Sequence, residues 1–187
     1  MKGLRGMGKI WSHFKTITHH KFLVMQGCFR VGLYLQGICH DLSKYSPSEF
    51  WLSAKYYQGY RSPLNAERED TGVSTVWLHH KGRNKHHYEY WMDSSLDPAL
   101  KGILVPVPMP KRYIAEMIMD RIAASKVYEG DKYTDSSALA YFAKDPDHRG
   151  MHPETAATLQ YYLEMLAEKG EKETFRRVKE DLVTGKK

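Results

Sequence analysis

The hydrophobic positions of this chain follow the three- and four-residue spacing of amphipathic helices, and we find no two-residue alternation typical of strands. The first such stretch predicts a helix over about residues 10–31, in which Ile17, Val24 and Val31 recur every seven residues. Later stretches predict helices at about residues 73–80, 111–128, 136–143, 153–169 and 172–183. The pattern therefore indicates an all-α fold.

The connections between these helices carry signals of their own. Residues 46–49 read Ser-Pro-Ser-Glu, which combines the S-x-x-E spacing of a capping box with proline at the first helical position. A helix is therefore expected to begin there and to end near Tyr57. Polar residues with Gly, Pro and Asn fill residues 58–72, which predicts a surface loop. Three prolines within residues 105–110 cannot lie inside a helix and predict an extended connection.

Length and charge narrow the class of protein. A chain of 187 residues, 27% of them charged, is expected to form one compact domain, here a single helical bundle over residues 1–187. No apolar run approaches the roughly 20 residues of a membrane span. The N-terminal segment lacks the apolar core of a signal peptide, so we expect a cytoplasmic protein with no membrane partner. The net charge of +6 is spread along the chain, which favours an anionic small substrate over a nucleic acid.

The unusual feature of the composition is the number of histidines, ten in all, of which eight lie before residue 88. In the first predicted helix, His20 shares a face with Ile17 and Val24 and projects from a largely apolar stripe. The same spacing directs Asp120 toward the core from a later helix. An inward carboxylate is costly unless it is paired or bound to a cation.

A third polar element is the pair His40-Asp41, which we expect on a short helix that begins near Tyr34. Taken singly, an inward histidine is more often a hydrogen-bonded core residue, and an inward aspartate is often a cap or an ion-pair partner. Two imidazoles and two carboxylates directed inward from different helices instead match the way helical bundles build metal sites. A second histidine block, His79-His80 and His86-His87, either adds ligands or lies in a surface loop.

Along the chain, the order is a histidine, then a His-Asp pair, then further histidines and finally an aspartate. This order resembles the HD-domain superfamily of metal-dependent phosphohydrolases. The resemblance begins with His20-Lys21-x-x-Val24. Residues 40–44, His-Asp-Leu-Ser-Lys, are similar to the superfamily's HD-[IL]-G-K signature, with Ser43 where glycine is common. Residues 119–124, Met-Asp-Arg-Ile-Ala-Ala, are similar to its final A-D-x-x-x-A segment.

The chain resembles still more a small, functionally uncharacterised bacterial and phage family. That family has the motifs HDLSK-x-S-P-S-E-F and N-x-H-H-x-E-Y-W, which here are residues 40–50 and 84–91. The resemblance covers a motif-bearing core at about residues 15–130. The C-terminal helices, at about residues 136–183, add little to it.

The resemblance implies an HD-like fold around one or two divalent cations. The minimal ligand set that it implies is His20, His40, Asp41 and Asp120. Two-metal members carry further histidines before the last aspartate, and the candidates here are His80 and one of His86 and His87. Imidazole and carboxylate ligands suit Mn, Fe, Ni, Co, Mg and Zn alike, so the ligands do not specify the metal.

A cation in such a centre would polarise a phosphoryl oxygen and supply hydroxide near neutral pH. Asp41 and Lys44 are then the expected catalytic residues. Lys44, Arg83 and Arg121 are candidates to bind substrate phosphate, although each could equally lie on a solvated helix face. Glu89 could orient a histidine or lie on the surface.

These observations predict a metal-dependent phosphohydrolase that acts on a nucleotide or another small phosphoester. Two other functions would use the same ligands. In a non-catalytic metal-binding helical module the cation would be structural, and in a di-iron oxidoreductase it would activate oxygen. Aromatic residues around positions 56–60 would permit a dimer.

Overall fold

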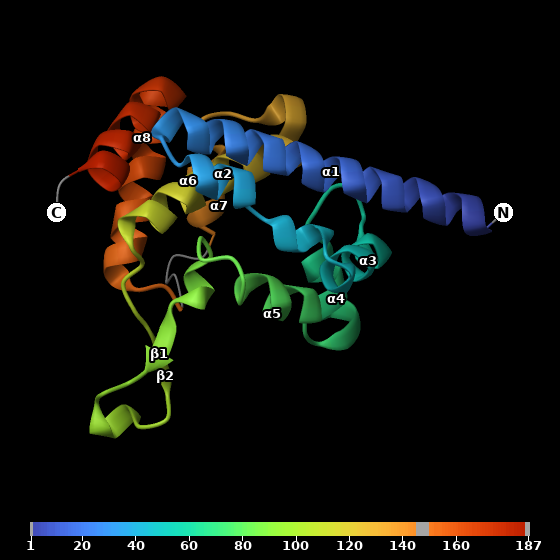
Figure 1. The fold of residues 1–187 in the computed structure, drawn as a ribbon, viewed down its shortest axis with the longest axis horizontal. Coiled ribbons are helices and arrows are strands. Elements are labelled where there is room, and N and C mark those ends of the chain that lie inside the picture. The colour runs from blue at the N-terminus through green and yellow to red at the C-terminus, as the bar shows by residue number, and fades with distance from the viewer. Residues whose placement is uncertain (1, 145–149, 186–187) are drawn as a thin grey trace.

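The computed structural model describes residues 2–144 and 150–185, with side chains from residue 7 onward. The α-helices of these ranges are α1 (Lys2–Val31), α2 (Tyr34–Cys39), α3 (Pro47–Tyr56), α4 (Pro63–Thr71), α5 (Thr75–Lys81), α6 (Lys111–Glu129), α7 (Ser137–Phe142) and α8 (Pro153–Val178). Two short strands, β1 (Met92–Ser94) and β2 (Leu104–Pro106), form an antiparallel hairpin. The predicted helical character is confirmed (Figure 1). Of the helices in the described ranges, none is long and apolar enough to cross a membrane.

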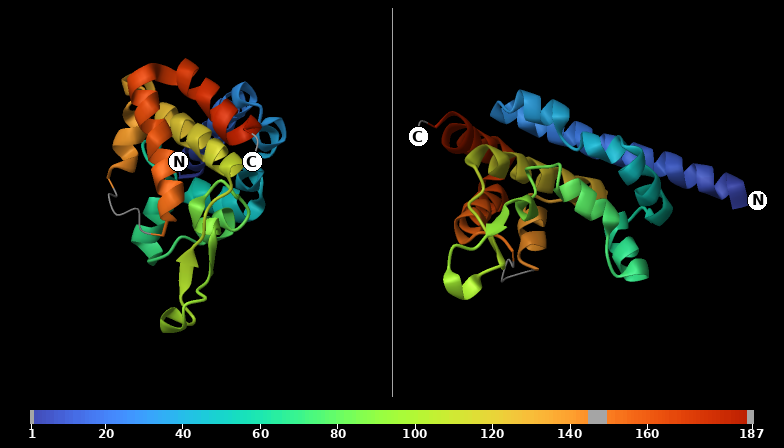
Figure 2. Two further views of the ribbon diagram at one scale, coloured as in Figure 1. Left: turned by 90° about the vertical axis from the view of Figure 1, so that its left-hand side faces the viewer. Right: turned by 60° about the horizontal axis from the view of Figure 1, so that its bottom comes forward.

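The core lies between the long helices α1, α6 and α8, which pack against one another (Figure 2). Val24 of α1, Ile118 of α6 and Leu163 of α8 are completely buried. Full burial of one such side chain contributes about 1.5–3 kcal/mol. The buried face of α1 is the predicted stripe, because Val24 and Val31 both lie in the core. His20, which shares this face, is therefore also buried.

Helix α2 packs closely against α1 at a glycine. A Cβ atom at Gly37 would lie 2.9 Å from Cβ of Cys28 and 3.3 Å from Cα of Met25, so only glycine permits this approach. Helix α2 ends at Cys39 because the next residue, His40, has non-helical backbone, with φ −51° and ψ 127°. The pair His40-Asp41 therefore lies in the connection after α2, and the prediction that it lies on the helix is wrong.

Helix α4 occupies most of the stretch that the sequence predicted as a surface loop. Ser62 caps it by accepting a hydrogen bond from the backbone N–H of Leu64, and Pro63 lies in its first turn. The polar composition concealed this helix because its buried face includes a charged residue. Glu67 is buried and accepts a hydrogen bond from Ser74 at the start of α5.

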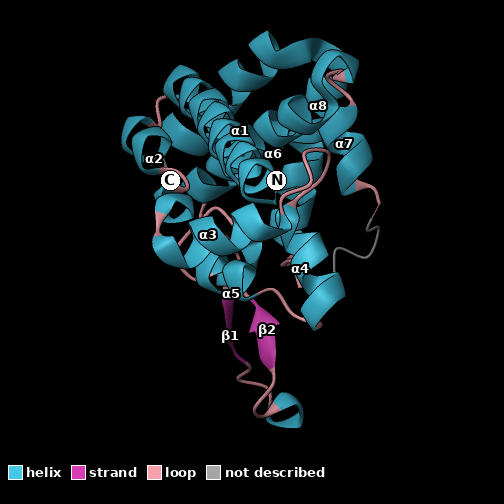
Figure 3. Ribbon diagram, turned by 90° about the vertical axis from the view of Figure 1, so that its right-hand side faces the viewer, coloured by secondary structure: helices cyan, strands magenta, loops and turns pink. Residues whose placement is uncertain are grey.

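The hairpin β1–β2 corrects the prediction that the chain has no strands. Met92 pairs with Pro106 and Ser94 pairs with Leu104, so each strand is too short to show an alternating pattern. The prolines at residues 105–110 do exclude helix, as predicted, and the extended segment that they form begins inside β2. The hairpin projects from the helical body (Figures 1 and 3).

Helix α8 is kinked at Gly170, which has φ 73° and ψ 174°. This backbone conformation strains any residue other than glycine. The kink agrees with the two separate helices predicted on either side of this position. After Val178 the chain continues as a π-helical turn (Lys179–Thr184).

Candidate metal centre

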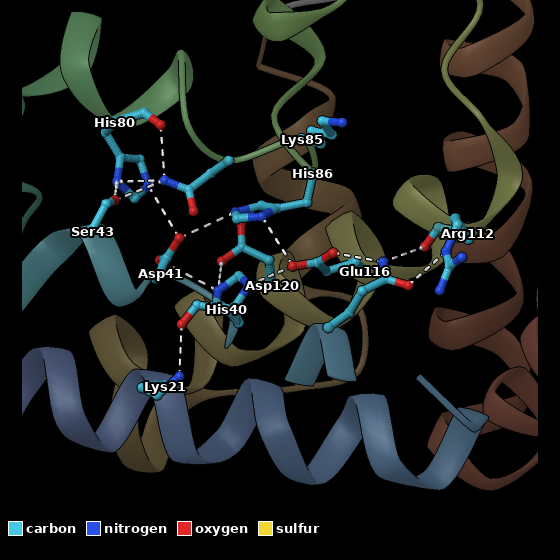
Figure 4. Close-up of polar contacts among 12 residues, drawn as sticks. Lys21, His40, Asp41, Ser43, His80, Lys85, His86, Arg112, Glu116 and Asp120 are labelled. Atoms are coloured by element: carbon cyan, nitrogen blue, oxygen red, sulfur yellow. Dashed lines mark hydrogen bonds and ion pairs between the residues drawn. The ribbon is translucent and has the colours of Figure 1, made fainter. Parts of the chain in front are cut away.

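Asp41 lies where α2 passes into a 3-10 turn (Leu42–Tyr45). Its φ of 53° is left-handed, and no other non-glycine residue in the described ranges has a positive φ. Strain of this kind is typical of functional sites. Lys21 holds the turn, because its Nζ donates to the carbonyl oxygens of Ile38 (2.6 Å) and His40 (2.8 Å; Figure 4). The Asp41 side chain lies in the interior and is 2% exposed.

Three residues from three parts of the chain meet on one side of Asp41 and form with it a group of four. His20 comes from α1, His40 follows α2 and Asp120 comes from α6. His20 Nε2 lies 3.0 Å from Asp120 Oδ1, and His40 Nε2 lies 3.3 Å from Asp41 Oδ2. These are the four ligands that the resemblance implied, and the structure brings all of them together. We call them the first group.

A second group surrounds the other carboxylate oxygen of Asp41. His80 Nε2 lies 3.2 Å and His86 Nε2 3.4 Å from Asp41 Oδ1. The ring of His87 lies beside that of His86, with centroids 4.1 Å apart. The side-chain amide of Asn84 donates to the backbone oxygen of His80 (2.8 Å) and closes the turn after α5 that brings these histidines together. Both members of the His86-His87 pair belong to this second group, whereas one was expected.

The imidazole atoms that face the centre have no hydrogen-bond partners among the residues that the structure describes. They are the buried Nε2 atoms of His20, His40, His80, His86 and His87. Oδ1 of Asp41 is likewise buried without such a partner in the described ranges, whereas Oδ2 lies 2.6 Å from Nζ of Lys44. Their mutual contacts of 3.0–3.7 Å lack hydrogen-bond geometry, as expected for atoms directed at a shared position.

A bound cation would account for these atoms. A buried polar atom without a partner costs about 1–3 kcal/mol, so a cluster of them is unfavourable unless something binds there. Within each group the candidate ligand atoms all lie within 4.8 Å of one another. Imidazole nitrogen and carboxylate oxygen are donors that divalent metals accept. Because each Asp41 oxygen faces one group, the donor set fits one cation or two.

Two buried glutamates lie behind the histidines. His40 Nδ1 donates to Oε1 of Glu116 (3.0 Å), and His86 Nδ1 lies 3.1 Å from the same oxygen (Figure 4). His80 Nδ1 donates to Oε2 of Glu49 (2.8 Å). A carboxylate at Nδ1 keeps the proton on that nitrogen and leaves the Nε2 lone pair for a metal, an arrangement common among metal-binding histidines.

Sequence reasoning missed the roles of both glutamates. Glu116 precedes Asp120 by one helical turn on α6, and this i, i+4 spacing is a signal that could have found it. Glu49 was interpreted as part of a capping box. Helix α3 does begin at Pro47, but without a side-chain cap: the hydroxyl of Ser46 contacts that of Ser48, and Glu49 is directed inward to His79 and His80. Glu49 and Glu116 thus have the orienting role that the sequence analysis considered as one of two alternatives for Glu89.

Burial and neighbouring charges set the pKa values of the centre in different ways. Burial prevails at His20 and His87 and lowers the pKa of both, aided by Lys44 at His20 and by His86 and His80 at His87. Burial disfavours the charged form of Asp41, but His40 and Lys44 outweigh it and hold the pKa of this carboxyl well below its ordinary value. Burial is also outweighed at His40, whose pKa is raised well above its ordinary value by Asp41 and the other carboxylates. At Glu116, burial would raise the pKa, but hydrogen bonds from His40 and His86 lower it to about 2. A cation would therefore have to displace protons from His40 and His80, the two candidate ligands whose pKa is raised by the nearby carboxylates even though burial opposes this.

Of the three cationic residues predicted to bind phosphate, Lys44 alone contacts the centre. Its Nζ lies 2.6 Å from Oδ2 of Asp41. Arg83 is exposed and donates to a backbone oxygen of α5. Arg121 directly follows a ligand on α6, so it points about 100° away around the helix. Its guanidinium lies over the ring of Phe142, 5.6 Å from the centroid.

The centre is most accessible on one side. The side chains of Lys44 and Asp120 are 31% and 17% exposed, whereas those of His80 and His86 are nearly completely buried. Solvent or a substrate would therefore approach the ligands from the side of Lys44 and Asp120.

Comparison with known proteins gives one match. A family model described as "Family of unknown function (DUF5662)" matches residues 9–165, a range that contains every member of both groups. No curated protein matches the chain, and no solved structure matches it. Because the matched range covers most of the sequence, the chain belongs to the DUF5662 family.

Proposed function

We propose that this protein is a metal-dependent phosphohydrolase of the HD-like type that acts on a nucleotide or another small phosphoester. The observation that carries the proposal is the convergence of unpartnered imidazole nitrogens on both oxygens of buried Asp41. The order of the ligands along the chain supports it. His20 comes first, then His40-Asp41, then the later histidines and finally Asp120, as in the HD-domain superfamily.

The donor set would supply ligands to two cations. The first would be held by the first group, and the second by His80, His86 and His87, with Asp41 contributing one oxygen to each. A divalent cation held there supplies Lewis-acid polarisation of a phosphoryl oxygen and a hydroxide nucleophile near neutral pH. Mn, Fe, Ni, Co, Mg and Zn all accept these donors.

Lys44 is the residue of this chain suited to bind the phosphate. It is positively charged, and contact with Asp41 raises the pKa of its ammonium group even though burial opposes this. It also lies on the accessible side of the centre. Lys44 neutralises Asp41 in the absence of a cation, and it would neutralise a phosphate oxygen once a cation takes over that contact.

The test is hydrolysis of a panel of nucleotides and aryl phosphoesters by untagged protein, with added Mn²⁺, Co²⁺, Ni²⁺ or Mg²⁺. We expect turnover that requires the metal and falls by at least about 100-fold in His40→Ala and Asp41→Ala, because each removes a ligand. His19→Ala is the matched control, since His19 is exposed and belongs to neither group.

Two other outcomes would contradict the proposal. Tight metal binding with no turnover on any phosphoester would favour a non-catalytic metal-binding module. Bound iron with a visible absorption band and oxygen consumption would favour a di-iron oxidoreductase that uses the same ligands.

A further inference from the structure

Glu116 lies behind both groups of ligands. Its Oε1 is 3.0 Å from Nδ1 of His40, a member of the first group, and 3.1 Å from Nδ1 of His86, a member of the second (Figure 4). The side chain is 6% exposed. A single carboxylate oxygen therefore contacts one histidine of each group.

The other oxygen of Glu116 is fixed by hydrogen bonds that lead to the surface. Gln36 Nε2 donates to Oε2 of Glu116 (2.7 Å), and Gln36 Oε1 accepts from Nε of exposed Arg112 (2.8 Å). Because the amide donates on one side and accepts on the other, its orientation is determined by both neighbours. Glu116 cannot turn toward one histidine without breaking its contact with Gln36.

Glu49 offers a comparison within the same molecule. Its Oε2 contacts Nδ1 of His80, a member of the second group, at 2.8 Å. Its Oε1 contacts Nδ1 of His79 at 2.5 Å, and His79 belongs to neither group. Both glutamates are buried and both face imidazole Nδ1 atoms. Within the described part of the chain, Glu116 contacts a histidine of each group and Glu49 contacts a histidine of one.

We propose that Glu116 is a positioning residue that sets the cation affinity of both groups at once, whereas Glu49 acts on the second group alone. The inference rests on the two-cation centre of the proposed function. A carboxylate at Nδ1 fixes the imidazole ring and makes Nε2 a stronger donor, and its loss typically weakens metal binding by about 10–100-fold. Glutamine at position 116 would keep the volume but would be a neutral, weaker acceptor.

The test is calorimetric titration of the metal-free, full-length protein with Mn²⁺ in two resolved steps. Glu116→Gln is expected to weaken both steps by about 10-fold or more, and Glu49→Gln to weaken one. In His80→Ala protein, which lacks a ligand of the second group, Glu116→Gln should still weaken the remaining step and Glu49→Gln should not. Gln36→Met, which releases Oε2 of Glu116 without touching a ligand, should weaken both steps to a smaller extent.

The outcomes separate this inference from the proposed function. An effect of Glu116→Gln on one step only, or equal effects of the two glutamate variants, would overturn the inference and leave the two-cation centre in place. Wild-type protein that binds fewer than two cations would overturn the two-cation centre and the inference with it. Thermal unfolding of each metal-free variant checks its fold. If Glu116→Gln does not fold, Gln36→Met tests the inference in its place. Weakening of both binding steps supports the inference, and weakening of one step or of neither overturns it.

Discussion

The two carboxylate oxygens of Asp41 face different histidines. Oδ2 lies toward His20 and His40, and Oδ1 lies toward His80 and His86. This single residue is thus the shared member of both groups. Its left-handed backbone turns the chain from α2 into the following 3-10 turn while its side chain remains in the interior.

Asp41→Asn should abolish cation binding with little change of fold. Asparagine has nearly the same size and tolerates left-handed backbone, but it carries no charge and offers one oxygen in place of two. We expect both cation affinities to fall by more than about 100-fold, since loss of a ligand costs more than loss of a residue behind it. Mn²⁺ titration of metal-free protein measures this. Exposed Asp131→Asn is the control, and unchanged binding in Asp41→Asn would contradict the assignment.

His13 is a buried histidine on α1 outside both groups. Its ring packs between those of Phe50 and Tyr57, with centroids 5.4 and 5.3 Å away, and its Nδ1 has no hydrogen-bond partner in the described ranges. Burial, aided by the charge of Lys44, lowers the pKa of His13 from 6.5 to about 4. The folded protein therefore keeps this histidine neutral at a pH where the unfolded chain protonates it.

The contribution of His13 to the stability of the metal-free protein should consequently fall as the pH is lowered through this window. Between the two pKa values the unfolded state binds more protons, so the free energy of unfolding decreases toward acid. His13 should account for about 2 kcal/mol of loss between pH 7 and pH 5. Urea unfolding at both pH values should show a smaller loss in His13→Phe than in wild type. His19→Gln should behave as wild type, and equal losses in His13→Phe and wild type would disprove the assignment.

At the scale of elements, the ligands on long helices were predictable and those in connections were not. The buried stripes of α1 and α6 place His20 and Asp120 inward, because an apolar face at helical spacing must face the core. The predicted helix extended over His40-Asp41, two residues beyond the end of α2, because no sequence signal marks the left-handed residue. Glu67 in α4 and Glu49 in α3 are charged but buried. The buried faces of these two helices are therefore less apolar than sequence patterns expect of a buried face.

The close packing of α2 on α1 makes a specific prediction at Gly37. Gly37→Ala would place a Cβ 2.9 Å from Cβ of Cys28 and 3.3 Å from backbone atoms of Met25, which cannot move aside. We expect a net destabilisation of about 1–2 kcal/mol, because overpacking outweighs the gain in helix propensity. In contrast, Gly8→Ala in α1 meets no atom within 4 Å and should stabilise by up to about 1 kcal/mol. Urea unfolding compares the two, and a Gly37→Ala protein as stable as wild type would refute the packing argument.

At the scale of the whole molecule, the candidate ligands come from segments far apart in the sequence. They lie on α1, after α2, on and after α5, and on α6. Every residue of the first group was predicted individually from the sequence, since the order of motifs resembles a known superfamily. The sequence could not show which of His86 and His87 belongs to the second group, because their positions depend on the turn that Asn84 closes after α5. Arg83 and Arg121 were proposed from proximity in sequence, and their side chains have other contacts.

A cation that joins these segments should stabilise the folded chain. Ligands bound to the folded state alone add about 2.7 kcal/mol at a concentration 100 times the Kd. Chelator treatment should therefore lower the Tm of wild-type protein, and added Mn²⁺ should restore it. His40→Ala should have a Tm that responds to neither treatment, whereas His19→Ala should respond as wild type. A wild-type Tm indifferent to both chelator and metal would count against the centre.

The central claim is that cations bind around Asp41, and anomalous diffraction from crystals soaked in Mn²⁺ tests it most directly. The account predicts one or two anomalous peaks at Asp41, each within direct coordination distance of Nε2 atoms of its own histidine group. Asp41→Asn crystals treated in the same way should show neither peak. Wild-type crystals with no peak at Asp41, or with Mn²⁺ bound only elsewhere, would contradict the metal centre and the phosphohydrolase proposal that depends on it.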